Sequence, residues 1–184
     1  MRASDVVEVL DQLRGAGAAH IVAGGWGIDA LLGAETRTHR DVDLLIDASD
    51  LGRAQLALAA ISFFPDDSRE PELPAFLMLR DARGRHVDLH LLVFDDAGNG
   101  RQHFSDRRSL DFPAGGLDGS GSIGGRSVAC LSPALQLRHH VGYDRDAGDE
   151  RDLRLLAERF GLTLPSQPER RGQRYADAGK SPPR

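Results

Sequence analysis

Apolar residues recur along the first 95 positions with a spacing that changes between helical and strand-like. Val6, Val9, Leu10 and Leu13 follow helical spacing, and glycines at positions 15 and 17 end that helix. Short apolar runs bounded by turn residues come next. These runs predict strands over 20–23, 41–46, 73–80 and 85–93, helices over 26–32 and 51–61, and a short edge strand over 62–64.

The second half of the chain has a weaker pattern. Residues 95–125 are rich in Gly, Asp and Ser and predict loops with one short strand near 109–112. Residues 125–131 predict another strand. Ser132 as the cap and Pro133 at the first helical position begin a helix that we expect to run to about residue 143. The remaining expectations are a last helix over about 149–160 and a disordered tail over 165–184, which has almost no apolar residues.

Two carboxylates interrupt the apolar strand at 41–46. Asp41 and Asp43 are separated by one residue, so strand alternation places both on one face. Two negative charges this close repel each other, and a cation between them relieves the repulsion. Gly24 and Gly25 lie upstream, where a helix begins, and offer a place for phosphate oxygens. The pattern predicts a metal-dependent site for phosphoryl or nucleotidyl transfer.

A third carboxylate, Asp88, lies in the alternating strand at 85–93. If this strand lies beside 41–46, the three carboxylates converge. Two would hold Mg²⁺, and the third would share a metal or accept the proton of an attacking hydroxyl. His86 and His90 share the face of Asp88 and have the spacing of zinc ligands, but oxygen ligands suit this chemistry better.

The composition narrows the class of protein. With 184 residues, 40% of them hydrophobic, the chain is large enough for one domain with a core. Its net charge of -5 argues against a general nucleic-acid footprint. The single cysteine, Cys130, excludes an internal disulfide. No apolar run approaches the roughly 20 residues that span a bilayer, and the N-terminus lacks a signal-peptide core. We therefore expect a cytoplasmic protein.

The motifs resemble a known superfamily. Gly24-Gly25-Trp26, Asp41-Val42-Asp43 and Asp88 are similar to the nucleotidyltransferase fold shared with DNA polymerase β. The wider segments 24–29, 36–43 and 125–153 resemble the aminoglycoside 2''-nucleotidyltransferases and lincosamide nucleotidyltransferases, which inactivate antibiotics.

The resemblance spans about residues 5–164. It implies an α/β (α+β) fold with a small mixed sheet flanked by helices and a short helical C-terminal part. It also implies a catalytic core over 1–95, a loop-rich and helical part over 96–164 that completes the same unit, and a separate tail.

The resemblance also implies roles for single residues. Asp41 and Asp43 would be metal ligands, and Asp88 the third metal ligand and the general base. Gly24 and Gly25 would let the backbone approach the triphosphate.

Basic residues of the motif would bind the nucleotide. Arg37 and His39 would reach its phosphates or the substrate. Relatives of the lincosamide type often carry a basic residue where this chain has Gly148, so that role would pass to Arg145, Arg151 or another residue.

Three further rings have less specific roles. Trp26 is expected to pack its helix against the sheet. For His140 and Tyr143 two roles remain open: packing two helices together, or lining the pocket for the nucleotide or acceptor.

The implied reaction is Mg²⁺-dependent transfer of a nucleoside monophosphate to a hydroxyl of an aminoglycoside or lincosamide antibiotic. AMP, taken from ATP, is the first choice of monophosphate. Two Mg²⁺ ions would take part. Acidic loop residues would attract a cationic aminoglycoside, although they also suit ordinary solvated loops. These residues are Asp95, Asp96, Asp106, Asp111 and Asp118.

Two rival functions remain open at this stage. A toxin-like nucleotidyltransferase would modify tRNA or a protein, and Arg80, Arg83 and Arg85 keep that option in view despite the negative net charge. A non-catalytic nucleotide-binding module would keep the fold alone, against which the intact carboxylates argue. A homodimer, formed through a sheet edge or the C-terminal helices, is also left open.

Overall fold

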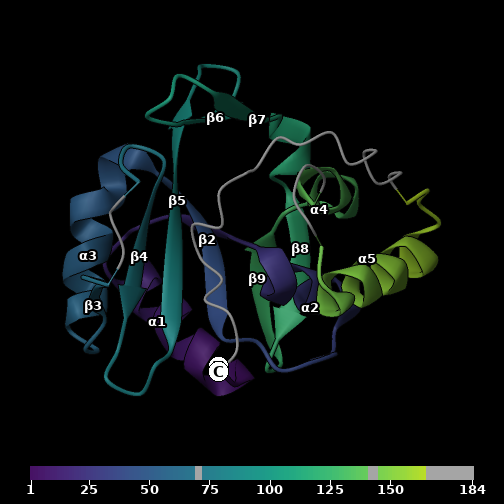
Figure 1. The fold of residues 1–184 in the computed structure, drawn as a ribbon, viewed down its shortest axis with the longest axis horizontal. Coiled ribbons are helices and arrows are strands. Elements are labelled where there is room, and N and C mark those ends of the chain that lie inside the picture. Colours follow the sequence, from purple (N-terminus) through teal and green to yellow (C-terminus); the bar gives the residue numbers. More distant parts are fainter. Residues whose placement is uncertain (69–71, 141–144, 165–184) are drawn as a thin grey trace.

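A mixed β-sheet forms the centre of the computed structural model, which describes residues 1–68, 72–140 and 145–164 (Figure 1). Strand β2 is parallel to β5 and β1 to β9, and the other neighbours are antiparallel. The expected mixed sheet flanked by helices is confirmed. The spatial order is β3 (Phe64–Pro65), β4 (Phe76–Arg80), β5 (His86–Phe94), β2 (Asp41–Asp47), β1 (His20–Ala23), β9 (Arg126–Cys130) and β8 (Gly119–Ile123).

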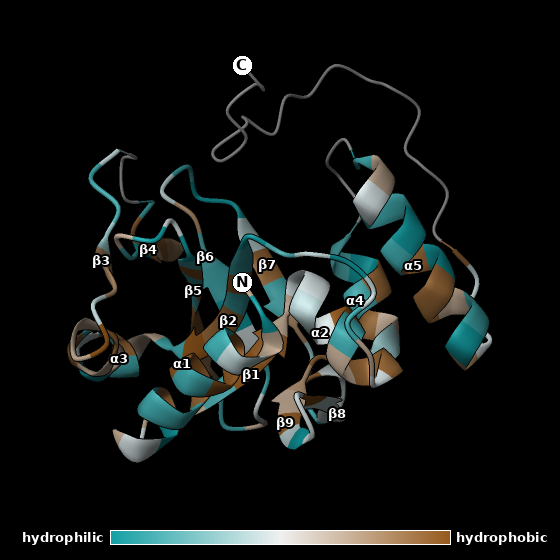
Figure 2. Cartoon of the chain, turned by 90° about the horizontal axis from the view of Figure 1, so that it is seen from below, coloured by the Kyte–Doolittle hydropathy of each residue, from teal (hydrophilic) through white to brown (hydrophobic). Residues whose placement is uncertain are grey.

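The helices form two groups. α1 (Ala3–Gly15) and α3 (Leu51–Ala59) contribute apolar residues to the main core with the central strands. α2 (Gly24–Leu32), α4 (Pro133–His139) and α5 (Ala147–Phe160) share a smaller cluster around Ile28 and Leu153. Figure 1 shows α3 beside β3 and β4 at one end of the molecule and α5 at the other, with β2 and β5 between them. In Figure 2 the central strands are largely hydrophobic, whereas α1 and α5 carry hydrophilic stretches.

The two faces of β2 and β5 differ in chemistry. Val42, Leu44, Val87 and Leu89 are fully buried in the main core. Because strand residues alternate, the residues between them face the opposite side of the sheet. The sheet therefore has one apolar face that holds the fold together and one face left for polar side chains.

Residues 95–125 contain more strands than expected. β6 (Gly100–His103) pairs with both β5 and β7 (Ser109–Phe112), and the two form an extension that we call the β6–β7 arm. β8 was expected to be a loop because of its Gly and Ser content, and that expectation was wrong. A Cβ on Gly119 would lie 2.5 Å from the carbonyl oxygen of Cys130, and one on Gly121 would lie 2.4 Å from that of Ala30. These glycines allow close packing of backbones rather than marking a turn.

Helix boundaries differ from the expectation at several ends. α2 begins at Gly24, so the glycine pair forms its first turn instead of preceding it. α5 begins at Ala147, capped by the Asp146 carboxylate, which accepts from the Asp149 amide. α4 ends at His139. The expected continuation over 141–143 and the tail over 165–184 lie outside the described residues, and the division of the chain at residue 95 stays a prediction.

Two smaller expectations concern burial and the membrane. Cys130 is buried and without a disulfide, and burial raises its pKa to about 11. Within the described ranges, the helices lack the combination of length and apolar character that a membrane crossing needs.

Replacement of Leu89 by Ala tests the core face of β5. Leu89→Ala should lower the free energy of unfolding by about 2–5 kcal/mol, because the side chain is fully buried and its loss leaves a cavity. Leu56→Ala on α3 is the matched control. Leu56 is 77% exposed, so its loss should change stability by less than about 0.5 kcal/mol. Urea unfolding followed by circular dichroism measures both, and equal losses would contradict the assigned core.

Candidate active site

The register of β2 against β5 brings the three carboxylates together. In this parallel pair, Asp43 lies opposite Asp88, Asp41 opposite His86, and Leu45 opposite His90. The three carboxylates therefore share the face that points away from the main core. The expected adjacency of the two strands is confirmed.

Electrostatics on this face reflect crowded negative charge. Burial, and next the charge of Asp43, raise the pKa of Asp41 above its usual value. Burial, the largest single cause, raises the pKa of Asp43, but the hydrogen bond from His90 and the charges of His90, His140 and His39 together outweigh it and lower that pKa. His90 Nε2 lies 3.1 Å from Asp43 Oδ1. The repulsion between the two carboxylates is the feature that a bound cation would relieve.

The carboxylates on this face suit a Mg²⁺ ion that is also bound by phosphate oxygens. Over residues 1–68, 72–140 and 145–164, no three His, Cys, Asp or Glu side chains are arranged to enclose a metal by themselves. Mg²⁺ needs less than that, because it usually takes one or two carboxylates and completes its shell with phosphate oxygens and water. Asp41 and Asp43 meet this requirement, whereas the ligand role of Asp88 stays a prediction.

The first turn of α2 lies directly against Asp43 and His39. Gly24 has a φ of 58°, and a Cβ there would lie 2.0 Å from Asp43 Oδ2. A Cβ on Gly25 would lie 2.4 Å from His39 Nδ1. Gln136 on α4 is fully buried and donates from Nε2 to the Gly24 carbonyl oxygen at 3.2 Å. The glycine pair thus places the positive end of a helix beside the carboxylates, as phosphate binding requires.

His39 is held by a buried acid of α2. Its Nε2 lies 2.6 Å from Asp29 Oδ2, and its ring lies 4.9 Å from that of Trp26, centroid to centroid. Asp29 also accepts hydrogen bonds from the amide and hydroxyl of Thr36. With Nε2 engaged, His39 presents Nδ1 toward Gly25. Trp26 is buried, as its expected packing role requires.

Arg37 is held by α5. Its Nε donates to Asp152 Oδ2 at 2.7 Å, and its guanidinium lies 3.9 Å from Asp149. Burial lowers the pKa of Arg37, but Asp152 and Asp149 outweigh this and raise it. A Cβ on Gly148 would lie 3.3 Å from Arg37 Nε, so Arg37 lies against the position at which the resemblance implies a basic residue.

Arg145, named as one substitute for that basic residue, pairs with Glu150 at 3.1 Å. Neither Arg145 nor the exposed Arg151 lines the cavity described next.

These side chains border a cavity of about 720 Å³, a size typical of small-molecule sites. One part is polar, and the other is apolar and built from β2, the residues around β4, and the β6–β7 arm. His140 lines the cavity, whereas Tyr143 lies outside the described residues. Asp88 is not among the lining residues. The polar part includes Gly24, Gly25, Arg37, His39, Asp41, Asp43, Asp146 and Asp149, and the apolar part Leu45, Phe76, Phe104, Leu110, Phe112 and Leu131.

Several of these contacts were not recognised in the sequence. Asp152 and Gln136 act through partners on other elements, and a single sequence carries no signal of such pairing. The position of Asp29, one turn into its helix, does predict a contact with a neighbouring loop, and Thr36 and His39 of the next loop make that contact. His90 was noted for its strand position, but its contact with Asp43 depends on the register of β2 and β5.

Comparisons with known proteins agree with this geometry. The model of the aminoglycoside-2''-adenylyltransferase family matches residues 5–156. A lincosamide resistance protein of Staphylococcus haemolyticus is 27% identical over 133 residues, or 72% of this chain and 80% of the relative.

Solved structures show the same fold. The lincomycin-bound lincosamide antibiotic adenylyltransferase LnuA matches with a TM-score of 0.72 and 25% identity, covering 83% of this chain and 94% of that one. ANT(2'')-Ia in complex with adenylyl-2''-tobramycin matches with a TM-score of 0.70 and 20% identity, covering 86% and 89%. The second match concerns the fold alone.

Replacement of Gly25 by Ala tests the close contact with His39. Gly25→Ala should lower the free energy of unfolding by about 1–3 kcal/mol, because the methyl group overlaps the His39 ring. Gly52→Ala is the matched control, since Gly52 is also the second residue of a helix and has open space around it. It should leave stability unchanged or raise it by up to about 1 kcal/mol. Urea unfolding compares the two, and similar effects would contradict the close approach.

Proposed function

This chain belongs to the aminoglycoside-2''-adenylyltransferase family, and from this premise we propose that it is a Mg²⁺-dependent enzyme that transfers AMP from ATP to a hydroxyl of a small antibiotic. Its class, nucleotidyltransferase, follows from the family. The ATP donor, two Mg²⁺ ions and the acceptor belong to the proposal. The observation that carries it is the placement of Asp43 against the first turn of α2, with Asp41 on the same face of β2 and Asp88 on the neighbouring strand.

Each group has a role in the transfer. Asp88 would accept the proton of the acceptor hydroxyl, a role that requires the acceptor to reach a carboxylate that does not line the cavity in this structure. The hydroxyl oxygen then forms a bond to the α-phosphorus of ATP. The bond from that phosphorus to the bridging oxygen breaks, and pyrophosphate leaves with the electron pair. Bound Mg²⁺, held by Asp41 and Asp43, would neutralise phosphate charge and align the displacement.

The leaving phosphates need positive partners. Arg37 supplies a cationic group beside the glycine turn, and His39 directs Nδ1 toward the same turn. Each is anchored by a carboxylate of a different helix, which keeps the donor in place when the cavity fills.

The walls of the cavity favour a partly apolar acceptor. Phe76, Phe104, Leu110 and Phe112 line it, and none of the five acidic loop residues does. A lincosamide combines a hydroxylated sugar with an apolar arm, whereas an aminoglycoside is polar and multiply cationic throughout. We therefore place the lincosamide type first.

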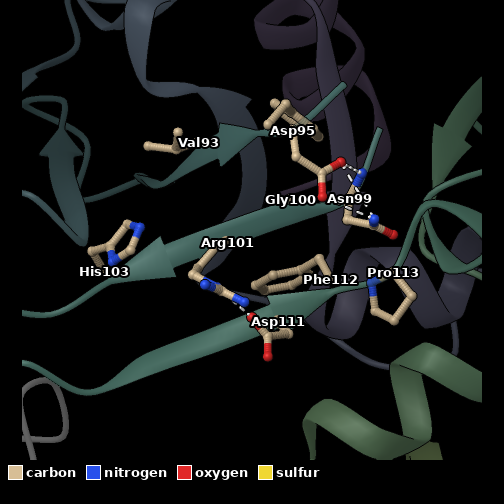
Figure 3. A pocket seen from close by; sticks show the side chains of 10 residues that line it. Val93, Asp95, Asn99, Gly100, Arg101, His103, Asp111, Phe112 and Pro113 are labelled. Atoms are coloured by element: carbon tan, nitrogen blue, oxygen red, sulfur yellow. Dashed lines mark hydrogen bonds and ion pairs between the residues drawn. The ribbon is translucent and has the colours of Figure 1, made fainter. Parts of the chain in front are cut away.

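Three of the five acidic loop residues are also engaged locally. Arg101 donates to Asp111 at 2.6 Å, and Asp95 accepts from Asn99, as Figure 3 shows in a second, smaller cavity beside the β6–β7 arm. Arg108 pairs with Asp106. Each of these charges is offset by its own partner or bound within its loop, which weakens the steering of a cationic drug.

Arg80, Arg83 and Arg85, which left a tRNA or protein target open, also form ion pairs with acidic residues. Arg85 lies 2.8 Å from Asp5 and 2.7 Å from Asp81, and Arg83 lies 3.7 Å from Asp5. Arg80 pairs with Asp66. Arg83 and Arg85 thus tie the β4–β5 turn to α1, and each of the three arginines has an acidic partner, which weakens the case for a surface that binds nucleic acid.

Replacement of Asp43 by Asn tests the metal-binding role. Asp43→Asn should abolish detectable AMP transfer from ATP to lincomycin, because the neutral amide cannot offset the metal charge. Asp47→Asn on the same strand is the matched control. Asp47 caps the turn at Ser49, a role that Asn can fill, so activity should stay near the wild-type level. Mass spectrometry of the drug measures both, and an active Asp43→Asn enzyme would refute the metal site.

Replacement of Leu110 by Ser tests the apolar wall. Leu110→Ser should raise KM for lincomycin by about 5–30-fold, the equivalent of about 1–2 kcal/mol, and leave KM for ATP unchanged. Val93→Ser is the control, because Val93 is also exposed and lines the second cavity but not the one described above. Steady-state kinetics with lincomycin and with tobramycin give the comparison. Preference for tobramycin, or an unchanged KM for lincomycin, would rule out the lincosamide assignment.

A further inference from the structure

We propose that Gln102 and His90 form a hydrogen-bonded relay that holds Asp43 in its working orientation, so that the β6–β7 arm positions the metal-binding carboxylate. The inference rests on the proposed function. It concerns two positioning residues, one of them on a strand that the sequence did not predict.

Gln102 is placed to direct the His90 ring. It is 2% exposed, and its Nε2 donates to the Ala75 carbonyl oxygen at 2.9 Å. The same nitrogen lies 3.3 Å from His90 Nδ1. An amide nitrogen carries two hydrogens, so one serves each partner. The Ala75 contact identifies this end of the amide as the donor, and His90 Nδ1 must then be the acceptor.

His90 passes this constraint to Asp43. With a lone pair on Nδ1, the neutral ring carries its proton on Nε2. Nε2 lies 3.1 Å from Asp43 Oδ1 and donates to it. Were the proton on Nδ1 instead, two donors would face each other at Gln102 and two acceptors would face each other at Asp43.

The other oxygen of Asp43 is confined by the backbone. Asp43 Oδ2 lies against Gly24, where a Cβ would lie 2.0 Å away. The carboxylate therefore accepts a hydrogen bond from His90 at Oδ1, and its Oδ2 lies against the turn that is proposed to bind phosphates. Groups that orient a metal ligand in this way typically affect metal affinity or activity by about 10–100-fold.

The relay also joins the two halves of the cavity. Gln102 lies on β6, two residues before Phe104 and beside the β7 strand that carries Leu110. The β6–β7 arm, which supplies part of the acceptor wall, thus also contacts through Gln102 the ring that holds Asp43. This contact offers a physical route from the acceptor wall to the metal site.

Kinetics of matched variants test the relay. Gln102→Leu should lower kcat for AMP transfer to lincomycin by about 10–100-fold, with KM for ATP within about threefold of wild type. His103→Leu on the same strand is the control and should leave kcat unchanged, because His103 is exposed and outside the main cavity. An unchanged kcat in a folded Gln102→Leu protein would overturn the proposal.

Variants of His90 separate positioning from packing. His90→Gln keeps an N–H donor near the Nε2 position, whereas His90→Asn places its amide near Nδ1 and cannot reach Asp43. His90→Gln should therefore retain more activity than His90→Asn. In the His90→Asn background, adding Gln102→Leu should cost less than about twofold more, because the relay is already broken. If the double variant instead lost activity by the product of the two single losses, Gln102 would act independently of His90, and the relay would be overturned.

A measurement without turnover keeps the relay distinct from the proposed function. Nitrogen-15 NMR of the His90 ring, recorded without metal at alkaline pH where the ring is neutral, should place the proton on Nε2. Gln102→Glu keeps the side-chain size but turns an acceptor toward the ring, so it should move the proton to Nδ1. A wild-type proton on Nδ1 would overturn the relay whatever the activity. An inactive wild-type enzyme with the expected ring signals would overturn the proposed function alone.

Discussion

The parallel pairing of β2 with β5 is the constraint on which the site depends. Side chains alternate along a strand, so a slip of one residue would exchange Asp88 with Val87 between the two faces of the sheet. The core face is fully buried, and such a slip would bury a charge there and expose an apolar side chain. The same hydrophobic pattern that stabilises the sheet therefore fixes the distance relation between Asp43 and Asp88.

Charged groups around the site are stabilised by pairing across elements. Asp29 of α2 holds His39, and Asp152 of α5 holds Arg37. A buried acid without a partner would lose more solvation than the fold could offset, so these pairs stabilise the nearby donors as well as orient them. The loop between α2 and β2 is thereby tied to both helices, and its donors reach the cavity already oriented.

The sequence supplied the central part of the fold and site, for physical reasons. Alternating strands and glycine-ended helices were readable because the interactions that define them are local, and the spacing of Asp41 and Asp43 predicted their shared face. Where long-range contacts decide the structure, the sequence was silent. β8 is rich in Gly and Ser because its backbone packs closely on its neighbours, and composition alone suggested a loop. The contact of Gln102 with His90 likewise joins strands whose pairing no local pattern reveals.

The β6–β7 arm is attached to the site by a contact between side chains that are distant in the sequence. An arm attached only to the end of β5 would be free to vary without affecting the carboxylates. Gln102 removes that freedom, because it is buried and bonded both to the Ala75 carbonyl and to His90. Residues of the arm that face the acceptor can change shape and polarity, as the exposed Leu110 can, while Gln102 keeps the strand in register with the metal site. Under the proposed function, this arrangement would let the acceptor wall vary without disturbing the groups assigned to the phosphates.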